Sequence, residues 1–366
     1  MGDSSARQPA VDASAPGTAT PQAASNPAAP SVEAISALGN EQLEIDDDAT
    51  SDLASTIDER ISQYTASLSS SIIDYPVEYG RRYHAFRPGS YAFPNDEREM
   101  DRLDMAHALI VKTIGSRLYL APIQKDEVRR ILDIGTGTGI WAVEMGDIFE
   151  NAEVIGNDLS AIQPDWVPPN VKFEIDDVES SWVGHQKYDF IMCRYMAASI
   201  KDWPKLVKNI YDNLNPGGWA EFQDVTSEWY SEDGTLSDKS FAWNWNRTLG
   251  QACRDIGRDP SPGAKLEGWV NDAGFQNIFH QRFKTPLGFW PKDPYYREIG
   301  MLNIAQLLDG LEGFTLKLSC NVLGRTKEET LVQIAQVRKE LKSGSMHIIY
   351  DTHVVYGQKP LEETEE

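Results

Sequence analysis

Residues 130–141, which read RILDIGTGTGIW, constrain the fold of this chain more than any other stretch. A short apolar run meets the acid Asp133, and an apolar, helix-compatible segment follows the loop. Between them three glycines alternate along the chain: Gly135, Gly137 and Gly139. Because glycine reaches positive φ at little cost, this pattern predicts a strand, a tight turn and a helix start. Such a turn lets a ligand lie against bare backbone above the N-terminal end of a helix.

Acidic residues end the next two predicted strands as well. Asp158 closes the run 153–158, and Asp176 and Asp177 follow the run 171–175. The loop is G-x-G-x-G, not the dinucleotide fingerprint G-x-G-x-x-G, and its acid disfavours a pyrophosphate and suits a cation. An acid after the second strand can bind ribose hydroxyls. Each feature alone is typical of a surface turn or a capping acid, but together they predict S-adenosylmethionine as the cofactor.

Composition excludes several other classes of function. A formal net charge of −22 over 366 residues argues against direct nucleic-acid binding and against an anionic membrane surface. No apolar run approaches the roughly 20 residues that cross a membrane. Three widely spaced cysteines form neither a disulfide framework nor a zinc motif, and no metal-ligand cluster stands out. We expect an intracellular protein, cytoplasmic or nuclear, with no metal. The sequence predicts no oligomeric state.

The N-terminal part divides into two predicted segments. Residues 1–50 are rich in Ala, Pro, Ser and Thr, which predicts a disordered tail or an interaction tail. Residues 51–125 are expected to form a helical extension that includes a helix over about 97–120. Within it, the aromatic and basic block 79–93 either folds over the cofactor as a lid or serves as ordinary packing.

Apolar runs and helical stretches alternate from about 128 to 225, which predicts a doubly wound, parallel α/β sheet. Five strands are expected, at residues 130–134, 153–157, 171–175, 190–193 and 219–223. Five further helices are expected, at residues 203–214, 241–256, 264–273, 295–311 and 328–341. Strand-like runs occur at 277–284 and 346–356.

Four longer strings resemble a known family: YGRRYHAFRPGSYAFPNDEREMDRLDMAH, LDIGTGTGIWAVEMGD, VIGNDLSAIQPDWVPPNVKFEIDDVESSW and NLNPGGWAEFQD. The chain from about Tyr79 to Lys359 is similar to the class I S-adenosylmethionine-dependent methyltransferases, and within them to the LaeA-like fungal methyltransferases. The resemblance implies a Rossmann-like, seven-stranded sheet with an antiparallel last strand. It implies a methyltransferase domain over 126–360, a helical N-terminal lid, and a helical substrate cover at about 293–341, before the last strand.

The resemblance also implies roles for single residues. The methionine moiety would lie against the loop formed by Asp133, Gly135, Gly137 and Gly139. Asp158 would bind both ribose hydroxyls beside Leu159, and Asp177 would bind the adenine amino group beside Val178, with Asp176 as the alternative. Arg194 would face the methyl group. Separately, the suspected lid leads us to expect that Tyr83 contacts the cofactor.

The expected reaction is methyl transfer to oxygen or nitrogen of a metabolite or a protein side chain. A proton acceptor is then needed, and His84 in the suspected lid is the first candidate, ahead of His280 and Tyr195. The resemblance implies a place in fungal secondary metabolism, as a tailoring enzyme or a regulator. The alternative function is a cofactor-binding transcriptional co-regulator that acts mainly through protein partners. The expected partners are therefore a small-molecule substrate or a regulatory protein.

Overall fold

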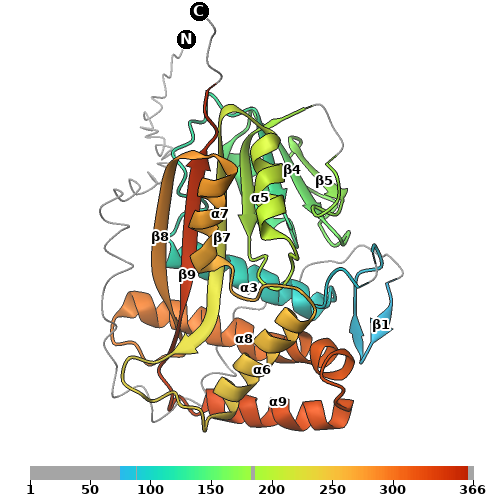
Figure 1. Ribbon diagram of the computed structural model, residues 1–366, viewed down its shortest axis with the longest axis vertical. Helices are drawn as coiled ribbons and strands as arrows, with labels where there is room; N and C mark the ends of the chain where they lie inside the picture. The colour runs from blue at the N-terminus through green and yellow to red at the C-terminus, as the bar shows by residue number, and fades with distance from the viewer. Residues whose placement is uncertain (1–74, 88, 183–185, 362–366) are drawn as a thin grey trace, which may run out of the picture.

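The computed structural model describes residues 75–87, 89–182 and 186–361. Its centre is a seven-stranded sheet with the strand order β5-β4-β3-β6-β7-β9-β8 (Figure 1). The strands are β3 (Arg130–Ile134), β4 (Glu153–Asp158), β5 (Val171–Ile175), β6 (Tyr188–Arg194), β7 (Leu214–Tyr230), β8 (Gln276–Leu287) and β9 (Ile348–Gln358). The pairs from β5 to β7 are parallel, and β9 runs antiparallel to both of its neighbours. The predicted sheet with an antiparallel last strand is confirmed.

Alternation along the strands produces two separate cores, because successive side chains point to opposite faces of a sheet. On β3, Ile131 packs toward α4 (Ile140–Ile148), whereas Leu132 packs toward α5 (Trp203–Asp212) and α7 (Leu266–Ala273). Helices α5 and α7 lie side by side in front of the sheet in Figure 1. Both faces of the parallel strands are therefore covered, as their continuous apolar runs require.

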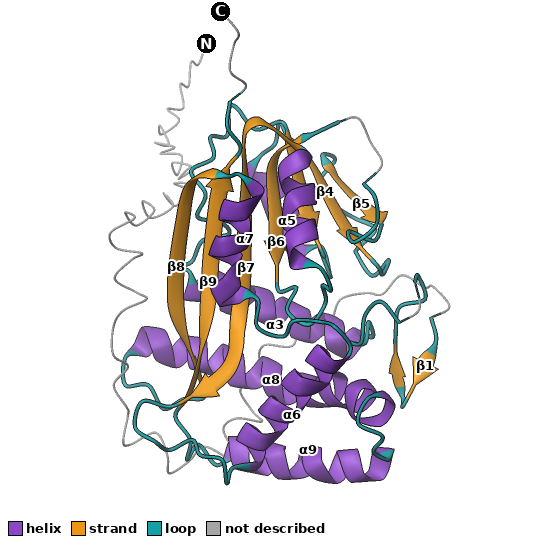
Figure 2. Ribbon diagram, in the orientation of Figure 1, coloured by secondary structure: helices purple, strands orange, loops and turns teal. Residues whose placement is uncertain are grey.

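A second layer, made of helices, lies beyond the end of β7 (Figure 2). It contains α3 (Glu97–Thr113), α6 (Phe241–Asp255), α8 (Pro294–Asn321) and α9 (Lys327–Lys342). Helix α8 packs against α3, α6 and α9, and buried side chains of α6, α8 and α9 share one core. The cover predicted over 293–341 is thus part of a larger helical layer that also recruits α3 and α6.

Several element boundaries differ from the prediction. Helix α3 ends at Thr113 and does not reach residue 120, because Gly115 and Ser116 have positive φ values of 84° and 58°. Helix α5 ends at Asp212, and Leu214 already begins the long strand β7. Helix α8 continues to Asn321, well beyond the predicted end near residue 311.

The predicted lid is helical only in α3. Before it, β1 (Val77–Glu78) pairs with β2 (Arg81–Arg82) as a short antiparallel hairpin, and loops lead to Glu97. Pairing between these two strands replaces a helix here, because the turn residues Tyr79 and Gly80 have positive φ. The predicted tail 1–50 and the first part of the predicted helical extension, residues 51–74, lie outside the described residues. None of the helices in the described part of the chain is long and apolar enough to cross a membrane.

Glu221 on β7 is a completely buried acid that holds the segment after α3. Its Oε2 accepts the backbone N–H groups of Leu120 and Ala121 at 2.7 and 2.6 Å. Its Oε1 accepts the side-chain amide of Gln223 at 2.7 Å. Burial raises the pKa of the Glu221 carboxyl from 4.5 to about 7 in spite of these donors.

We predict that Glu221→Gln stabilises the protein at pH 8 and much less at pH 5. A raised folded pKa means that the contribution of Glu221 to stability falls as pH rises from about 4.5 to about 7. Glutamine has no proton to lose, so the difference from the parent should grow over this window, to at most about 3 kcal/mol. Thermal unfolding from pH 5 to 8 measures this. Exposed Glu174 on β5 is the control position, and a pH-independent difference for Glu221→Gln contradicts the prediction.

Candidate functional site

The glycine loop between β3 and α4 is held by the end of β4. The N–H of Thr136 donates to the carbonyl of Asn157, and the N–H of Gly137 donates to Asp158 Oδ2, both at 2.9 Å. Asp158 Oδ1 accepts the N–H of Ser160 at 2.9 Å. The carboxylate of Asp158 therefore bridges two loops at the carboxyl edge of the sheet, where open α/β folds bind ligands.

At Gly137 the backbone of the loop is accessible, because few atoms lie near the position of its missing side chain. Gly137 has a φ of 58°, and a Cβ built there would contact only Leu103, at 3.4 Å. At Gly135, in contrast, a Cβ would lie 2.5 Å from Met196 Sδ, so a side chain there would require Met196 to move. Gly139, the third glycine, precedes α4 as its N-cap residue.

A cavity opens above this loop, and we call it the loop cavity. It is bounded by the loop, by the ends of β4, β5 and β6, and by residues from the block 79–93 and α3. The predicted site residues that line it are Gly135, Gly137, Asp158, Leu159, Asp176, Asp177, Val178 and Arg194. Asp133 and Gly139 are not among the lining residues. Asp133 is buried and accepts a hydrogen bond from the Thr136 hydroxyl at 2.6 Å, so it shapes the loop from below.

Two acids that flank the glycine loop, Asp133 on β3 and Asp158 at the end of β4, favour a positively charged ligand. Burial raises the pKa of the Asp133 and Asp158 carboxyls to about 6, and nearby Arg194 opposes this effect at Asp133. A cationic or hydroxyl-rich ligand would lower this desolvation cost by pairing with the charged form. These hydrogen-bond acceptors therefore fit a ligand that carries an ammonium group and sugar hydroxyls.

Arg194 at the end of β6 supplies a complementary donor. Its Nη2 donates to Nδ1 of His107 at 3.0 Å, and His107 Nε2 in turn donates to Glu144 at 3.1 Å. Burial lowers the pKa of His107, which agrees with a neutral ring that accepts from Arg194. Arg194 Nη1 is buried and has no hydrogen-bond partner among the described residues. A buried guanidinium N–H without a partner fits an anionic group, such as the carboxylate of an amino-acid tail.

Two acids lie at the far end of the loop cavity. Asp177 accepts the N–H of Glu179 at 3.0 Å and the Ser180 hydroxyl at 3.2 Å, and Arg87 Nε lies 3.5 Å from its Oδ2. Asp176 is exposed and accepts the N–H of Asp177. Both carboxylates line the cavity, so both remain candidates for an adenine amino group.

Tyr83 and His84, predicted to contact the cofactor and to accept a proton, lie outside the loop cavity. Tyr83 is 1% exposed with its ring under Lys317 Nζ of α8, and His84 is 4% exposed. The block 79–93 contributes its later residues instead, among them Tyr91. The turn after β1 directs Tyr83 and His84 toward α8, an outcome that no local pattern signals.

The two weaker candidates for a proton acceptor lie in different places. His280 on β8 binds Glu267 at 2.8 Å and His353 at 2.9 Å, and it does not line the loop cavity. Tyr195 follows β6 with a φ of 53° and lines the loop cavity. Burial raises the pKa of Tyr195 far above neutrality.

A second cavity, which we call the acceptor cavity, adjoins the first and has a volume of about 250 Å³. It lies between the sheet and the helical layer, with walls from α3, α6, α8 and the ends of β7, β8 and β9. The residues that line both cavities are Tyr91, Leu103, Tyr195 and Ser199. No sequence pattern predicts this cavity, because its walls come from segments up to about 260 residues apart, Tyr91 and Tyr350 among them.

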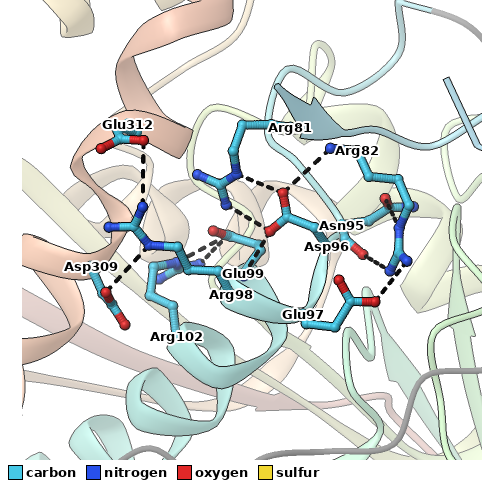
Figure 3. A network of polar contacts seen from close by, with 10 residues as sticks. All are labelled: Arg81, Arg82, Asn95, Asp96, Glu97, Arg98, Glu99, Arg102, Asp309 and Glu312. Atoms are coloured by element: carbon cyan, nitrogen blue, oxygen red, sulfur yellow. Dashed lines mark hydrogen bonds and ion pairs between the residues drawn. The ribbon is translucent and has the colours of Figure 1, made fainter. Parts of the chain in front are cut away.

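A network of charged residues links the hairpin β1–β2 to α3 and α8 (Figure 3). Arg81 donates hydrogen bonds from Nε and Nη2 to the carboxylate of Asp96, at 2.5 and 2.8 Å. Asp96 also caps α3, because its side chain accepts the N–H of Glu99. One turn later Arg102 pairs with Glu99, and Arg98 reaches Asp309 and Glu312 on α8. The hairpin, α3 and α8 are thereby tied into one frame around the cavities.

Comparisons with known proteins agree with this geometry. A family described as "Methyltransferase domain" matches residues 105–280. The chain is 50% identical to methyltransferase pytC of Aspergillus terreus over 295 residues, which cover 80% of this chain and 91% of pytC. It is 35% identical to the secondary metabolism regulator LAE1 of Cochliobolus heterostrophus, over 78% of this chain and 94% of LAE1. It is 32% identical to the secondary metabolism regulator laeA of Aspergillus fumigatus, over 78% of each chain.

The glycine loop, the strand-end acids and the helical layer thus occur in a chain whose relatives match it over most of their length. These relatives include proteins named as methyltransferases and proteins named as regulators. The chain belongs to the LaeA-like fungal family of class I S-adenosylmethionine-dependent methyltransferases.

Proposed function

We propose that this protein transfers the methyl group of S-adenosylmethionine to an oxygen or nitrogen atom of an acceptor in fungal secondary metabolism. The observation that carries the proposal is the pair of adjoining cavities. One is lined by the glycine loop and strand-end acids, and the other by the helical layer. The acceptor is a metabolite or a protein side chain, as the relatives named methyltransferase and regulator suggest.

The residues of the loop cavity have distinct proposed roles toward the cofactor. Asp158 accepts the ribose hydroxyls, and Asp177 or Asp176 accepts the adenine amino group beside Val178. The backbone at Gly137 and the unpartnered N–H of Arg194 hold the amino-acid tail, with Asp133 behind the loop as a fixed negative charge. The bound cofactor supplies a sulfonium, which is a good leaving group.

The chain itself chiefly supplies position. The two cavities share the wall residues Tyr91, Leu103, Tyr195 and Ser199, so the acceptor atom and the methyl group meet there. Holding two reactants in a near-attack arrangement contributes roughly 7–11 kcal/mol to lowering the barrier. Since His84 lies outside both cavities, we do not assign it the proton-accepting role.

A second candidate function is a cofactor-binding co-regulator that acts through protein partners. It is favoured by 35% and 32% identity to proteins named as secondary metabolism regulators, but the identity to pytC is higher, at 50%. Metabolite profiles of a deletion strain separate the two functions. Loss of one methyl group from one compound supports tailoring, whereas changes across many compounds, with a stable protein partner, support regulation.

We predict that Asp158→Asn weakens binding of S-adenosylhomocysteine about 10- to 100-fold. The substitution keeps the size of the side chain but removes the charge, and a hydrogen bond to a charged group contributes about 1.5–3 kcal/mol. Calorimetry with S-adenosylhomocysteine measures the effect. Glu153→Gln, at the opposite end of the same strand, is the matched control and should bind as the parent does. Equal affinity of Asp158→Asn and the parent would place the ribose elsewhere.

We further predict that Gly137→Ala reduces S-adenosylhomocysteine affinity at least tenfold while the protein stays folded. The added methyl group has room in the empty cavity, yet it occupies the place where a ligand approaches the backbone. Gly234→Ala is the control, because Gly234 also has positive φ, at 76°, and a Cβ there would meet nothing within 4 Å. Calorimetry and melting temperature are compared for both variants.

If NAD binds the parent more tightly than S-adenosylhomocysteine, the proposed function fails.

A further inference from the structure

The acceptor cavity has mostly apolar walls from segments far apart in the chain. Aromatic and aliphatic side chains form most of its surface, among them Phe93, Trp229, Trp245, Leu249, Leu307 and Phe314. Flat aromatic walls favour a flat, apolar ligand, since stacking and dispersion increase with contact area. The cavity is thus suited to a planar body with few polar atoms.

The acceptor cavity is partly open to solvent, but the side chains that line it are largely covered. All of its lining residues are buried or half-buried, and none is exposed. A volume of about 250 Å³ accommodates a small molecule. A side chain of a folded protein is attached to its backbone, which would also need room near the cavity. This volume therefore favours a free metabolite over a protein acceptor.

The charge at the cavity wall belongs to a buried ion pair, in which Arg102 lines the cavity and Glu99 lies behind it. Among the described lining residues Arg102 is the single ionised side chain, and none is Asp, Glu or His. An ammonium group would therefore find no carboxylate on the wall, and a neutral hydroxyl would find no ordinary base. Tyr195 does not fill that role, because burial raises its pKa. A hydroxyl that already ionises in water needs neither a carboxylate partner nor a base on the wall.

Arg102 still has donors to offer. Glu99 Oε1 accepts from its Nε and Nη2 at 3.0 and 2.7 Å (Figure 3), and Gln306 accepts from its Nη1 at 3.0 Å. A guanidinium carries five N–H bonds, so two remain after these three. They suit an oxyanion, since charge-assisted hydrogen bonds from Arg are strong and directional.

We propose that the methyl acceptor is a small, planar, largely apolar molecule with an acidic enol or phenol hydroxyl, bound as its oxyanion to Arg102. This inference rests on the proposed function and names the substrate class of the same site. Water takes the hydroxyl proton before binding. An oxygen lone pair then forms the new O–C bond to the methyl carbon. The electrons of the broken C–S bond return to sulfur, so the products are a neutral methyl ether and S-adenosylhomocysteine.

The test is calorimetry on the full-length protein saturated with S-adenosylhomocysteine, at pH 8, with three probes. 4-Hydroxycoumarin is a planar enol that ionises, 4-methoxycoumarin has the same shape without the acidic proton, and 1-naphthylmethylamine carries an ammonium group. We expect 4-hydroxycoumarin to bind at least tenfold more tightly than the other two. Equal or tighter binding of either other probe, or no binding of 4-hydroxycoumarin, overturns the inference.

Variants connect the preference to Arg102. Glu99→Gln combined with Arg102→Gln removes both charges and leaves no unpaired buried ion. We expect this variant to bind 4-hydroxycoumarin at least tenfold more weakly and S-adenosylhomocysteine within threefold of the parent. Arg247→Gln, on α6, exposed and outside the lining residues, is the control and should keep the preference. A preference that survives in the double variant overturns the role of Arg102.

Two outcomes separate this inference from the proposed function. If the parent does not bind S-adenosylhomocysteine, the proposed function fails, and the inference fails with it. If it binds S-adenosylhomocysteine but transfers a labelled methyl group to a lysine-rich peptide in preference to 4-hydroxycoumarin, the function stands and the inference fails.

Discussion

The site depends on the parallel pairing of β3 with β4. In this register Ile134 lies opposite Asn157, so the loop that leaves β3 meets the last residues of β4. The carbonyl of Asn157 and the carboxylate of Asp158 then accept N–H groups that a glycine-rich turn exposes. One hydrogen-bonded junction thereby shapes the loop and delivers an acid to the cavity. A shift of register would remove the acid and leave the loop N–H groups without these acceptors.

The second dependence is electrostatic and lies outside the sheet. Arg81 and Asp96 join the short hairpin to the first turn of α3, and Arg98 joins α3 to α8 (Figure 3). These ion pairs hold the helical layer over the carboxyl edge of the sheet. The acceptor cavity lies between the sheet and this helical layer.

Predictions from the sequence were best where the signal was local. The turn after β3 needs glycine for backbone reasons, and an acid at a strand end must lie at the sheet edge. Residues that such local signals assigned, among them Asp158 and Gly137, do line one cavity. Tyr83 and His84 line neither cavity, because the direction of a loop side chain depends on distant partners, such as Lys317 of α8 at the Tyr83 ring. No spacing within the block 79–93 encodes that partner.

The amino-acid sequence by itself thus determined the doubly wound sheet, the glycine turn and the family, since each rests on periodicity, turn chemistry or local strings. Only the tertiary structure decided which lid residues reach the site, and that α6 and α8 wall a second cavity. It also decided that Arg102 is the charged group there. The physical reason is that cavities and buried charges arise from contacts between segments far apart in the chain. Periodicity reports which face of a segment is buried, but not which segment covers it.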